Sequence, residues 1–339
     1  MNQTKQQIWL FSFWVFLALA TPFIAVFLGV ADIPFTDVWK SITGTGSGHT
    51  QSIILDIRLP RIITGALSGL HLAVAGLILQ NITRNPLADP SIMGISQGAT
   101  FAVSLFLLLT MSQDYHGSAA LPVMPLHYLP SVALIGGLFA GFIIYCLAIR
   151  SGLSPLRLTL CGIAVGAVLH ALAIGLLAGW GSNRMEVMLE WLAGSLYARS
   201  WEHVRTLLPY TIIGLGALFF LHRPLELLKL NAESAASFGL AYQKHFTLAL
   251  GLACLLAASA VGTVGPISFV GLVVPHLARF LARKNPQMIF SFTILLGMIS
   301  VTAGDLLARL IGQAEEIPVG VMTAFFGAPL FILLLRKTR

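Results

Sequence analysis

Charged residues are scarce in this chain of 339 residues: Asp, Glu, Lys and Arg together make up 10% of it, and hydrophobic residues make up 57%. A soluble domain carries about 25% charged residues. The chain therefore lacks the charge to cover a water-exposed surface of its size, and we interpret it as an integral membrane protein. Its net charge of +7 does not indicate nucleic-acid binding, because no basic aromatic patch accompanies it. Basic residues on the cytoplasmic side of a membrane protein explain the excess better.

Cysteines and catalytic motifs are equally sparse. The three cysteines, Cys146, Cys161 and Cys254, lie in apolar runs without CxxC or Cys/His ligand spacing, so neither a disulfide framework nor a zinc site is indicated. The chain contains no Gly-Lys-Ser/Thr and so cannot form a P-loop, and it has no HExxH pattern. We therefore expect a protein that is not an enzyme, with no catalytic residue, no metal site and no cofactor of its own.

Long apolar runs dominate the rest of the sequence. A helix needs about 20 apolar residues to span a bilayer, and we expect an all-α, single-domain membrane protein (residues 1–339) with about ten such helices. The first run continues through Val30, which is too long for a signal peptide, so we expect an uncleaved helix. The segment 187–197 is too short to span and is predicted to be an interfacial or inserted half-helix. The predicted spans are 9–30, 60–80, 92–111, 130–149, 158–180, 207–222, 246–264, 266–281, 288–308 and 317–335.

The distribution of basic residues predicts the orientation. Ten spans place both termini on one side, and that side holds 13 of the 20 basic residues. Basic residues collect on the cytoplasmic side, so both termini are predicted to be cytoplasmic.

Ionisable residues inside the predicted spans are few. They would mark an ion or proton path, but no carboxylate lies well inside a span, since Asp305 is near the end of the ninth. His71 and His170 are interpreted as hydrogen-bonded residues of the bundle rather than proton carriers. The energy for any transport is therefore expected to come from a partner, with an ion-coupled secondary transporter as the alternative.

The segment 225–240 is amphipathic and lies on the predicted cytoplasmic side. Its small residues Ala232, Ala235 and Ala236, together with an end at Gly239, favour a short helix in close contact with another protein. An amphipathic helix lying on lipid is the alternative.

Several motifs resemble one known family, the permease subunits of type II ABC importers, often called FecCD, which take up iron-siderophores, haem and cobalamin. The resemblance extends from about residue 56 to 330. It rests on Arg58-Leu59-Pro60-Arg61, Gln80, Asn85 to Pro90, Gly94 and Gly98, Gly265 to Leu272, Pro275-His276-Leu277-Ala278-Arg279, Gly304-Asp305 with Arg309, Glu316 to Gly320, and Gly327-Ala328-Pro329.

The resemblance implies a permease of the cytoplasmic membrane of a prokaryote that moves a ferric siderophore inward, with haem or cobalamin as alternatives. Its implied partners are a second permease subunit, identical or related, two cytoplasmic ATP-binding subunits and one extracytoplasmic substrate-binding protein. ATP would be bound by the ATPase subunits and not by this chain.

The resemblance also implies three groups of site residues. Arginines at the outer face would pair with carboxylates of the binding protein, because the planar guanidinium meets a carboxylate with two hydrogen bonds. The groups are Arg58, Arg61 and Arg309 for docking; Leu228, Asn231, Ala232, Glu233, Ala236, Phe238, Gly239 and Leu240 for coupling to the ATPase; and Asn85 and Leu87 with Pro155 and Leu156, from the loop Ser151–Arg157, at the cytoplasmic gate.

Overall fold

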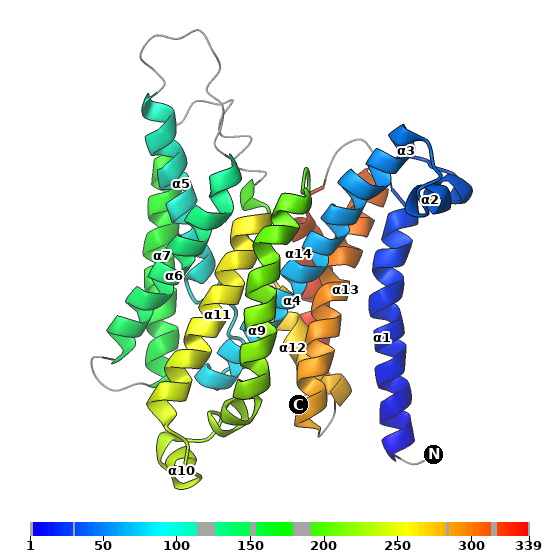
Figure 1. Ribbon diagram of the computed structural model, residues 1–339. Helices are drawn as coiled ribbons and strands as arrows, with labels where there is room; N and C mark the ends of the chain where they lie inside the picture. The colour runs from blue at the N-terminus through cyan, green and yellow to red at the C-terminus, as the bar shows by residue number, and fades with distance from the viewer. Residues whose placement is uncertain are drawn as a thin grey trace.

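The computed structural model describes residues 3–29, 31–113, 126–149, 154–178, 191–282, 285–312 and 317–337, and over these ranges the regular structure is helical, without a strand. Most of the long helices run side by side in one bundle (Figure 1). The long helices are α1 (Gln3–Phe27), α4 (Leu59–Thr83), α5 (Ile95–Gln113), α6 (Leu129–Ile149), α7 (Pro155–Ala178), α9 (Trp201–Leu227), α11 (Tyr242–Val264), α13 (Pro286–Gly312) and α14 (Val319–Lys337).

Shorter helices complete the described chain. They are α2 (Phe35–Ile42), α3 (Gly48–Ser52), a π-helix (Ile53–Arg58) that runs into α4, a 3₁₀ turn (Leu126–Tyr128), α10 (Ala232–Ser237) and α12 (Val270–Ala282). Figure 1 places the start of α1, the end of α14 and α10 at one end of the bundle, which we call the terminal end. Helices α2 and α3 lie at the opposite, distal end.

The described helices coincide with the predicted apolar runs. Seven are long and apolar enough to cross a membrane, and three shorter apolar helices lie within α5, α12 and α14. The chain is therefore an all-helical, multi-pass membrane protein. The predicted span 266–281 differs most, because residues 265–269 are not helical. The 13 residues of α12 reach about 20 Å, less than the hydrocarbon thickness of about 30 Å.

Helices α4 and α11 form the centre of the bundle. The most apolar stretch of the helix that ends in α4 is 89% buried, and that of α11 is 78% buried. The corresponding stretches of α1 and α7 are each 22% buried. Small residues allow α4 to approach its neighbours closely. A Cβ added to Gly69 would lie 2.1 Å from the carbonyl oxygen of Gly297 in α13, and one added to Gly76 would lie 2.0 Å from that of Gly271 in α12. Gly69 and Gly76 therefore serve the close packing of α4.

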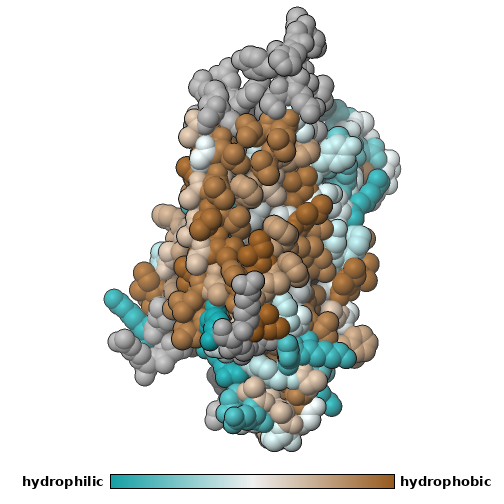
Figure 2. Space-filling model, turned by 90° about the vertical axis from the view of Figure 1, so that its left-hand side faces the viewer, coloured by the Kyte–Doolittle hydropathy of each residue, from teal (hydrophilic) through white to brown (hydrophobic). Residues whose placement is uncertain are grey.

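The outer surface of α5, α6 and α7 is apolar. Figure 2 shows this face as a nearly continuous hydrophobic band, with hydrophilic residues at the terminal end and along the right-hand edge of the view. Exposed Phe139 and Phe142 of α6 and Leu160 and Leu172 of α7 contribute to it. An apolar surface of this extent is stable only against lipid or another protein.

The segment 187–197, predicted as a half-helix, is inserted but is helical only at Trp191 and Leu192 among its described residues. Residues 187–190 lie outside the described ranges, and from Trp191 the chain passes inside the bundle, with Trp191 and Leu196 buried. The Ser195 N–H donates to the Val264 carbonyl oxygen at 2.9 Å, and the Gly320 N–H donates to that of Gly194 at 3.1 Å. Three segments therefore meet here: the inserted segment around Gly194, the link between α11 and α12, and the start of α14 at Gly320. We call this place the glycine junction.

The two histidines singled out from the sequence differ. His71 is fully buried in α4, and its ring nitrogens pair with the hydroxyls of Ser259 at 2.9 Å and Thr211 at 2.8 Å. This side chain joins α4, α9 and α11, as predicted for a hydrogen-bonded bundle residue. His170 is exposed on α7, so its predicted place inside the bundle is wrong.

Candidate functional site

Three arginines predicted at the outer face lie at the distal end, and each is held inside the chain. Arg58, the last residue of the π-helix, is 4% exposed. Its guanidinium donates to the carbonyl oxygens of Val26 at 2.8 Å, Phe27 at 3.3 Å and Ala31 at 2.6 Å. The last carbonyls of a helix lack partners within the helix and carry partial negative charge. Arg58 therefore caps the C-terminus of α1.

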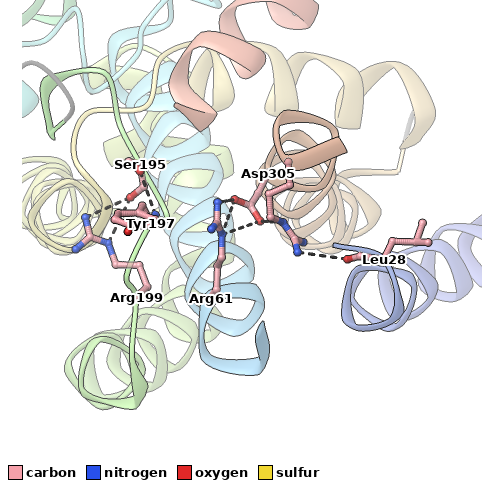
Figure 3. Close-up of polar contacts among 7 residues, drawn as sticks. Leu28, Arg61, Ser195, Tyr197, Arg199 and Asp305 are labelled. Atoms are coloured by element: carbon pink, nitrogen blue, oxygen red, sulfur yellow. Dashed lines mark hydrogen bonds and ion pairs between the residues drawn. The ribbon is translucent and has the colours of Figure 1, made fainter. Parts of the chain in front are cut away.

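The other two arginines share one carboxylate (Figure 3). Arg61 of α4 donates to Asp305 of α13 through Nε at 3.0 Å and through NH2 at 2.8 Å. Arg309, one turn beyond Asp305, approaches the second carboxylate oxygen at 3.0 Å and donates to the Leu28 carbonyl oxygen at 3.3 Å. Asp305 is 2% exposed, so this bridge ties α4, α13 and the end of α1 together away from water.

Arg199 is a fourth arginine of this group, and sequence reasoning missed it. It lies before α9, and its Nε and NH2 both donate to the Ser195 carbonyl oxygen at 3.3 Å. Burial, together with the nearby charge of Arg61, lowers the pKa of Arg199 to about 10. The side chain is therefore still protonated at neutral pH. No local motif marks it, since only the fold brings it near Arg61.

Four arginines gather around the buried Asp305 at the distal end, an arrangement that suits an acidic partner. Each of the three predicted docking guanidiniums nevertheless has acceptors within the chain, and each residue is less than 10% exposed. Contact between Arg58, Arg61 or Arg309 and a binding protein stays a prediction.

The predicted coupling segment forms a compact knob at the terminal end (Figure 1). Asn231 caps α10 by accepting the Ser234 N–H at 2.7 Å, as a helix N-cap requires. Gly239 has φ +82°, and its N–H donates to the Ala236 carbonyl oxygen at 2.8 Å. The short helix ending near Gly239 is confirmed, with the left-handed glycine that commonly ends helices.

The knob has a buried side and an exposed side. Leu228 and Ala235 are fully buried and Leu240 is 8% exposed, and all three belong to the main hydrophobic core. Phe238 is 69% exposed. The other predicted coupling residues, Asn231, Ala232, Glu233, Ala236 and Gly239, are exposed as well. A tightly anchored helix that presents an aromatic ring outward is suited to contact another protein.

The predicted gate residues also lie towards the terminal end. The Asn85 side chain accepts the Leu87 N–H at 2.9 Å, which forms the turn after α4. Pro155 and Leu156 differ from the prediction, because they form the first turn of α7 and not a loop. Residues 151–153 of the predicted loop lie outside the described ranges. Leu87 and Leu156 are 45% and 70% exposed, and their gate role stays a prediction.

Comparison with known proteins decides the family, since residues 17–337 match the FecCD transport family. The chain belongs to this family. It is 35% identical over 316 residues to the iron(3+)-hydroxamate import system permease protein FhuG of Bacillus subtilis, covering 93% of both chains. It is 34% identical over 330 residues to the Fe(3+) dicitrate transport system permease protein FecD of Escherichia coli, covering 96% of this chain and 98% of that one.

A solved structure agrees with the FecCD assignment. The protein resembles a chain of a metal-chelate type ABC transporter in an inward-facing conformation, with a TM-score of 0.84 and 27% sequence identity, over 96% of this chain and 98% of that one. This FecCD protein is thus the permease subunit of an ABC importer.

The motif Pro275 to Arg279 of this FecCD permease has a structural role that the sequence did not reveal. Pro275 has no N–H, so it leaves the carbonyl of Gly271 without its helical donor. Gln80 of α4 replaces that donor, because its Nε2 lies 3.0 Å from the Gly271 oxygen. Arg279 holds the other end of the same amide, with NH1 2.6 Å from Gln80 Oε1. Gln80 and Arg279 therefore fix the proline-containing α12 against α4.

Asp89 lies in the turn after α4, and it is buried, with 3% of its surface exposed. Its Oδ1 accepts the Ser91 N–H at 2.8 Å. Its Oδ2 lies 2.7 Å from the place a Cβ on Gly271 would occupy, and the Leu72 carbonyl lies 3.1 Å from that place. Because Leu72 is near the middle of α4, the turn after α4 folds back into the bundle and carries a carboxylate with it.

Proposed function

We propose that this FecCD permease imports a ferric siderophore across the cytoplasmic membrane of a prokaryote. The observation that carries the proposal is the knob at the terminal end, which is anchored by Leu228 and Ala235 and exposes Phe238. In this proposal the knob sits in a groove of a cytoplasmic ATPase. The hydrolysis of ATP takes place in that partner and not in this chain.

The proposed topology has ten spans with both termini in the cytoplasm. It is supported by the seven long and three shorter apolar helices and by the excess of basic residues on one side. The start of α1 and the end of α14 both lie at the terminal end (Figure 1), which agrees with an even number of crossings. The shorter helices are accommodated where non-helical backbone is buried in protein, as at the link between α11 and α12.

The proposed assembly has a second permease subunit, two ATPase subunits and one extracytoplasmic binding protein at the distal end. ATP binding would close the two ATPases and move both knobs. The rigid anchoring of α10 on Leu228, Ala235 and Leu240 would pass that motion to α9 and α11. The helices then rock about a central pathway that opens to alternate sides.

The substrate class rests on the relatives, whose names include iron-hydroxamate, iron-citrate and ferric enterobactin permeases. The substrates in these names differ chemically, yet the sequence identity of this chain to each relative is similar, at 34% or 35%. Selectivity is therefore expected mainly in the binding protein. Haem or cobalamin import by the same mechanism is the alternative that an uptake assay separates, by comparing a gene-deletion strain with its parent for each chelate.

Phe238→Asp tests the coupling assignment. A buried carboxylate without a partner is costly, so a charge in the ATPase groove should uncouple transport and reduce uptake of the ferric siderophore at least tenfold. The measurement is uptake of radiolabelled ferric siderophore, together with ATP hydrolysis by the reconstituted importer. The control is Ser237→Asp, which adds the same charge at an exposed residue next to Phe238. Equal uptake in Phe238→Asp and the parent, with the protein present at the same level, would refute the role of the knob.

A further inference from the structure

An apolar cavity of about 300 Å³ lies among α1, α12, α13 and α14. It is about twice the size of a buried cavity that binds benzene and reaches the range of small-ligand pockets. The permease mechanism proposed above makes no use of it. Its walls include Trp14 of α1, Leu277 of α12, Ala303 of α13, and Phe326 and Leu330 of α14.

One polar group in these walls lacks a partner. The hydroxyls of Ser300 and Thr323 donate to carbonyl oxygens of their own helices at 2.9 and 3.0 Å. The indole Nε1 of Trp14, in contrast, is buried and has no acceptor among the described residues. A buried donor without a partner is destabilising. Water would not satisfy it well, because a buried water needs two to four polar partners.

The position of the cavity along the helices places it in one leaflet. Trp14 lies five residues after Trp9, where the apolar window of α1 begins, which corresponds to about 7.5 Å. Leu330 lies seven residues before the end of α14 at Lys337, which corresponds to about 10 Å. The cavity therefore lies within the acyl-chain region of the leaflet at the terminal end. Side chains of a helix point back towards its N-terminus, so the Trp14 indole is directed towards the ester level of that leaflet.

Lipid surrounds the outer side of α1. Phe16 and Leu19 of this helix are 68% and 69% exposed, and the helix packs chiefly against α13. Acyl chains are therefore the apolar matter present next to the cavity. A phospholipid also carries what the cavity lacks, since the ester carbonyl at the head of each acyl chain is a hydrogen-bond acceptor.

We propose that this cavity binds one acyl chain of a phospholipid from the leaflet at the terminal end, with an ester carbonyl oxygen accepting the Trp14 Nε1 hydrogen. The chain fills the space between α1 and the helices α12, α13 and α14. The lipid thus becomes part of the packing of α1 on the bundle, which the direct contacts of α1 leave incomplete.

Native mass spectrometry of the complete importer tests this proposal. The complex is reconstituted with palmitoyl-oleoyl-phosphatidylglycerol, extracted in mild detergent and washed, and bound lipid is counted per permease chain. We expect one lipid fewer in Ala303→Phe, which fills the cavity, than in the parent. Trp14→Phe keeps the ring and removes the donor, so its retention should weaken roughly tenfold. Trp9→Phe is the matched control on the same helix, because Trp9 is 67% exposed and does not line the cavity.

Several results would overturn the proposal. One is a parent complex without a retained lipid, and another is equal retention in the parent and Ala303→Phe. Unchanged retention in Trp14→Phe would overturn the hydrogen bond. Separation of two permease copies in Ala303→Phe, with lipid still bound, would assign the cavity to a subunit interface instead. If Ala303→Phe fails to assemble, Ser300→Leu fills the same wall and carries the same expectation. Lipid counting does not depend on the transported substrate, so this test can fail while the proposed function stands.

Discussion

Replacing Gln80 by Leu should destabilise the permease through the proline-containing helix α12. The substitution leaves the Gly271 carbonyl buried without a donor, because Pro275 offers none. It also removes the acceptor of Arg279. An unsatisfied buried group costs about 1–3 kcal/mol, and a hydrogen bond to a charged group contributes about 1.5–3 kcal/mol. Since the charged arginine can turn towards the membrane surface, we expect a total loss of about 2–4 kcal/mol in the free energy of unfolding.

A double-mutant cycle isolates the contribution of the carbonyl. Pro275→Ala restores an N–H at position 275, four residues after Gly271, where a regular helix donates to that oxygen. In this background Gln80→Leu should cost about 1–2 kcal/mol less than in the parent, because the loss at Arg279 is common to both. The cycle thereby cancels the packing change caused by removing the proline ring.

The assay is equilibrium unfolding in mixed micelles with increasing sodium dodecyl sulfate, followed by circular dichroism. Gln243→Leu, on an exposed face of α11, is the control for replacing an amide with an apolar group and should change stability by no more than about 0.5 kcal/mol. Additivity of Gln80→Leu and Pro275→Ala within about 0.5 kcal/mol would refute the argument that Gln80 substitutes for the missing helical donor.

Two further substitutions test the distal bridge and the close helix contacts. Asp305→Asn should lower the free energy of unfolding by about 3–5 kcal/mol, because it leaves two buried arginines without their carboxylate. The control Asp37→Asn, at an exposed ion pair with 3.6 Å separation, should cost at most about 1 kcal/mol. Similar losses for both variants in the same unfolding assay would contradict the bridge. Gly76→Ala should be destabilising, because its Cβ would lie 2.0 Å from a backbone oxygen. The control Gly175→Ala, whose Cβ would have nothing within 4 Å, should be neutral or raise stability by up to about 1 kcal/mol. Thermal melts in which both variants are destabilised would contradict the close packing at Gly76.

The existence of the helices could be predicted from the sequence, because an apolar run of span length has few alternatives in a bilayer. The boundaries were less accurate where backbone conformation decides them. Residues 265–269 are as apolar as a helix, but Gly265 and Phe269 have φ values of +78° and +69°, which end the helical path. Hydropathy does not report on this geometry.

The site was predictable where its signal is local and hidden where it depends on distant residues. The cap at Asn231 and the turn at Gly239 follow from a few neighbouring residues, and both were found. Arg61 was interpreted as an outward-facing charge, since its partner Asp305 lies 244 positions away along the chain. The depth of Asp89 was hidden for the same reason, because only the folded turn brings it beside α4.

The glycine junction limits where this molecule can bend. A Cβ at Gly320 would lie 2.1 Å from the Ala193 oxygen, and one at Gly265 would lie 2.2 Å from the Trp191 oxygen. With no side chain between them, these backbones cannot slide past one another without a collision between main-chain atoms. Because backbone hydrogen bonds also join them, we expect the inserted segment, the start of α14 and the link between α11 and α12 to move as one rigid body. Any hinge used during transport has to lie outside this block, and spin labels placed within the block should keep constant separations throughout the transport cycle.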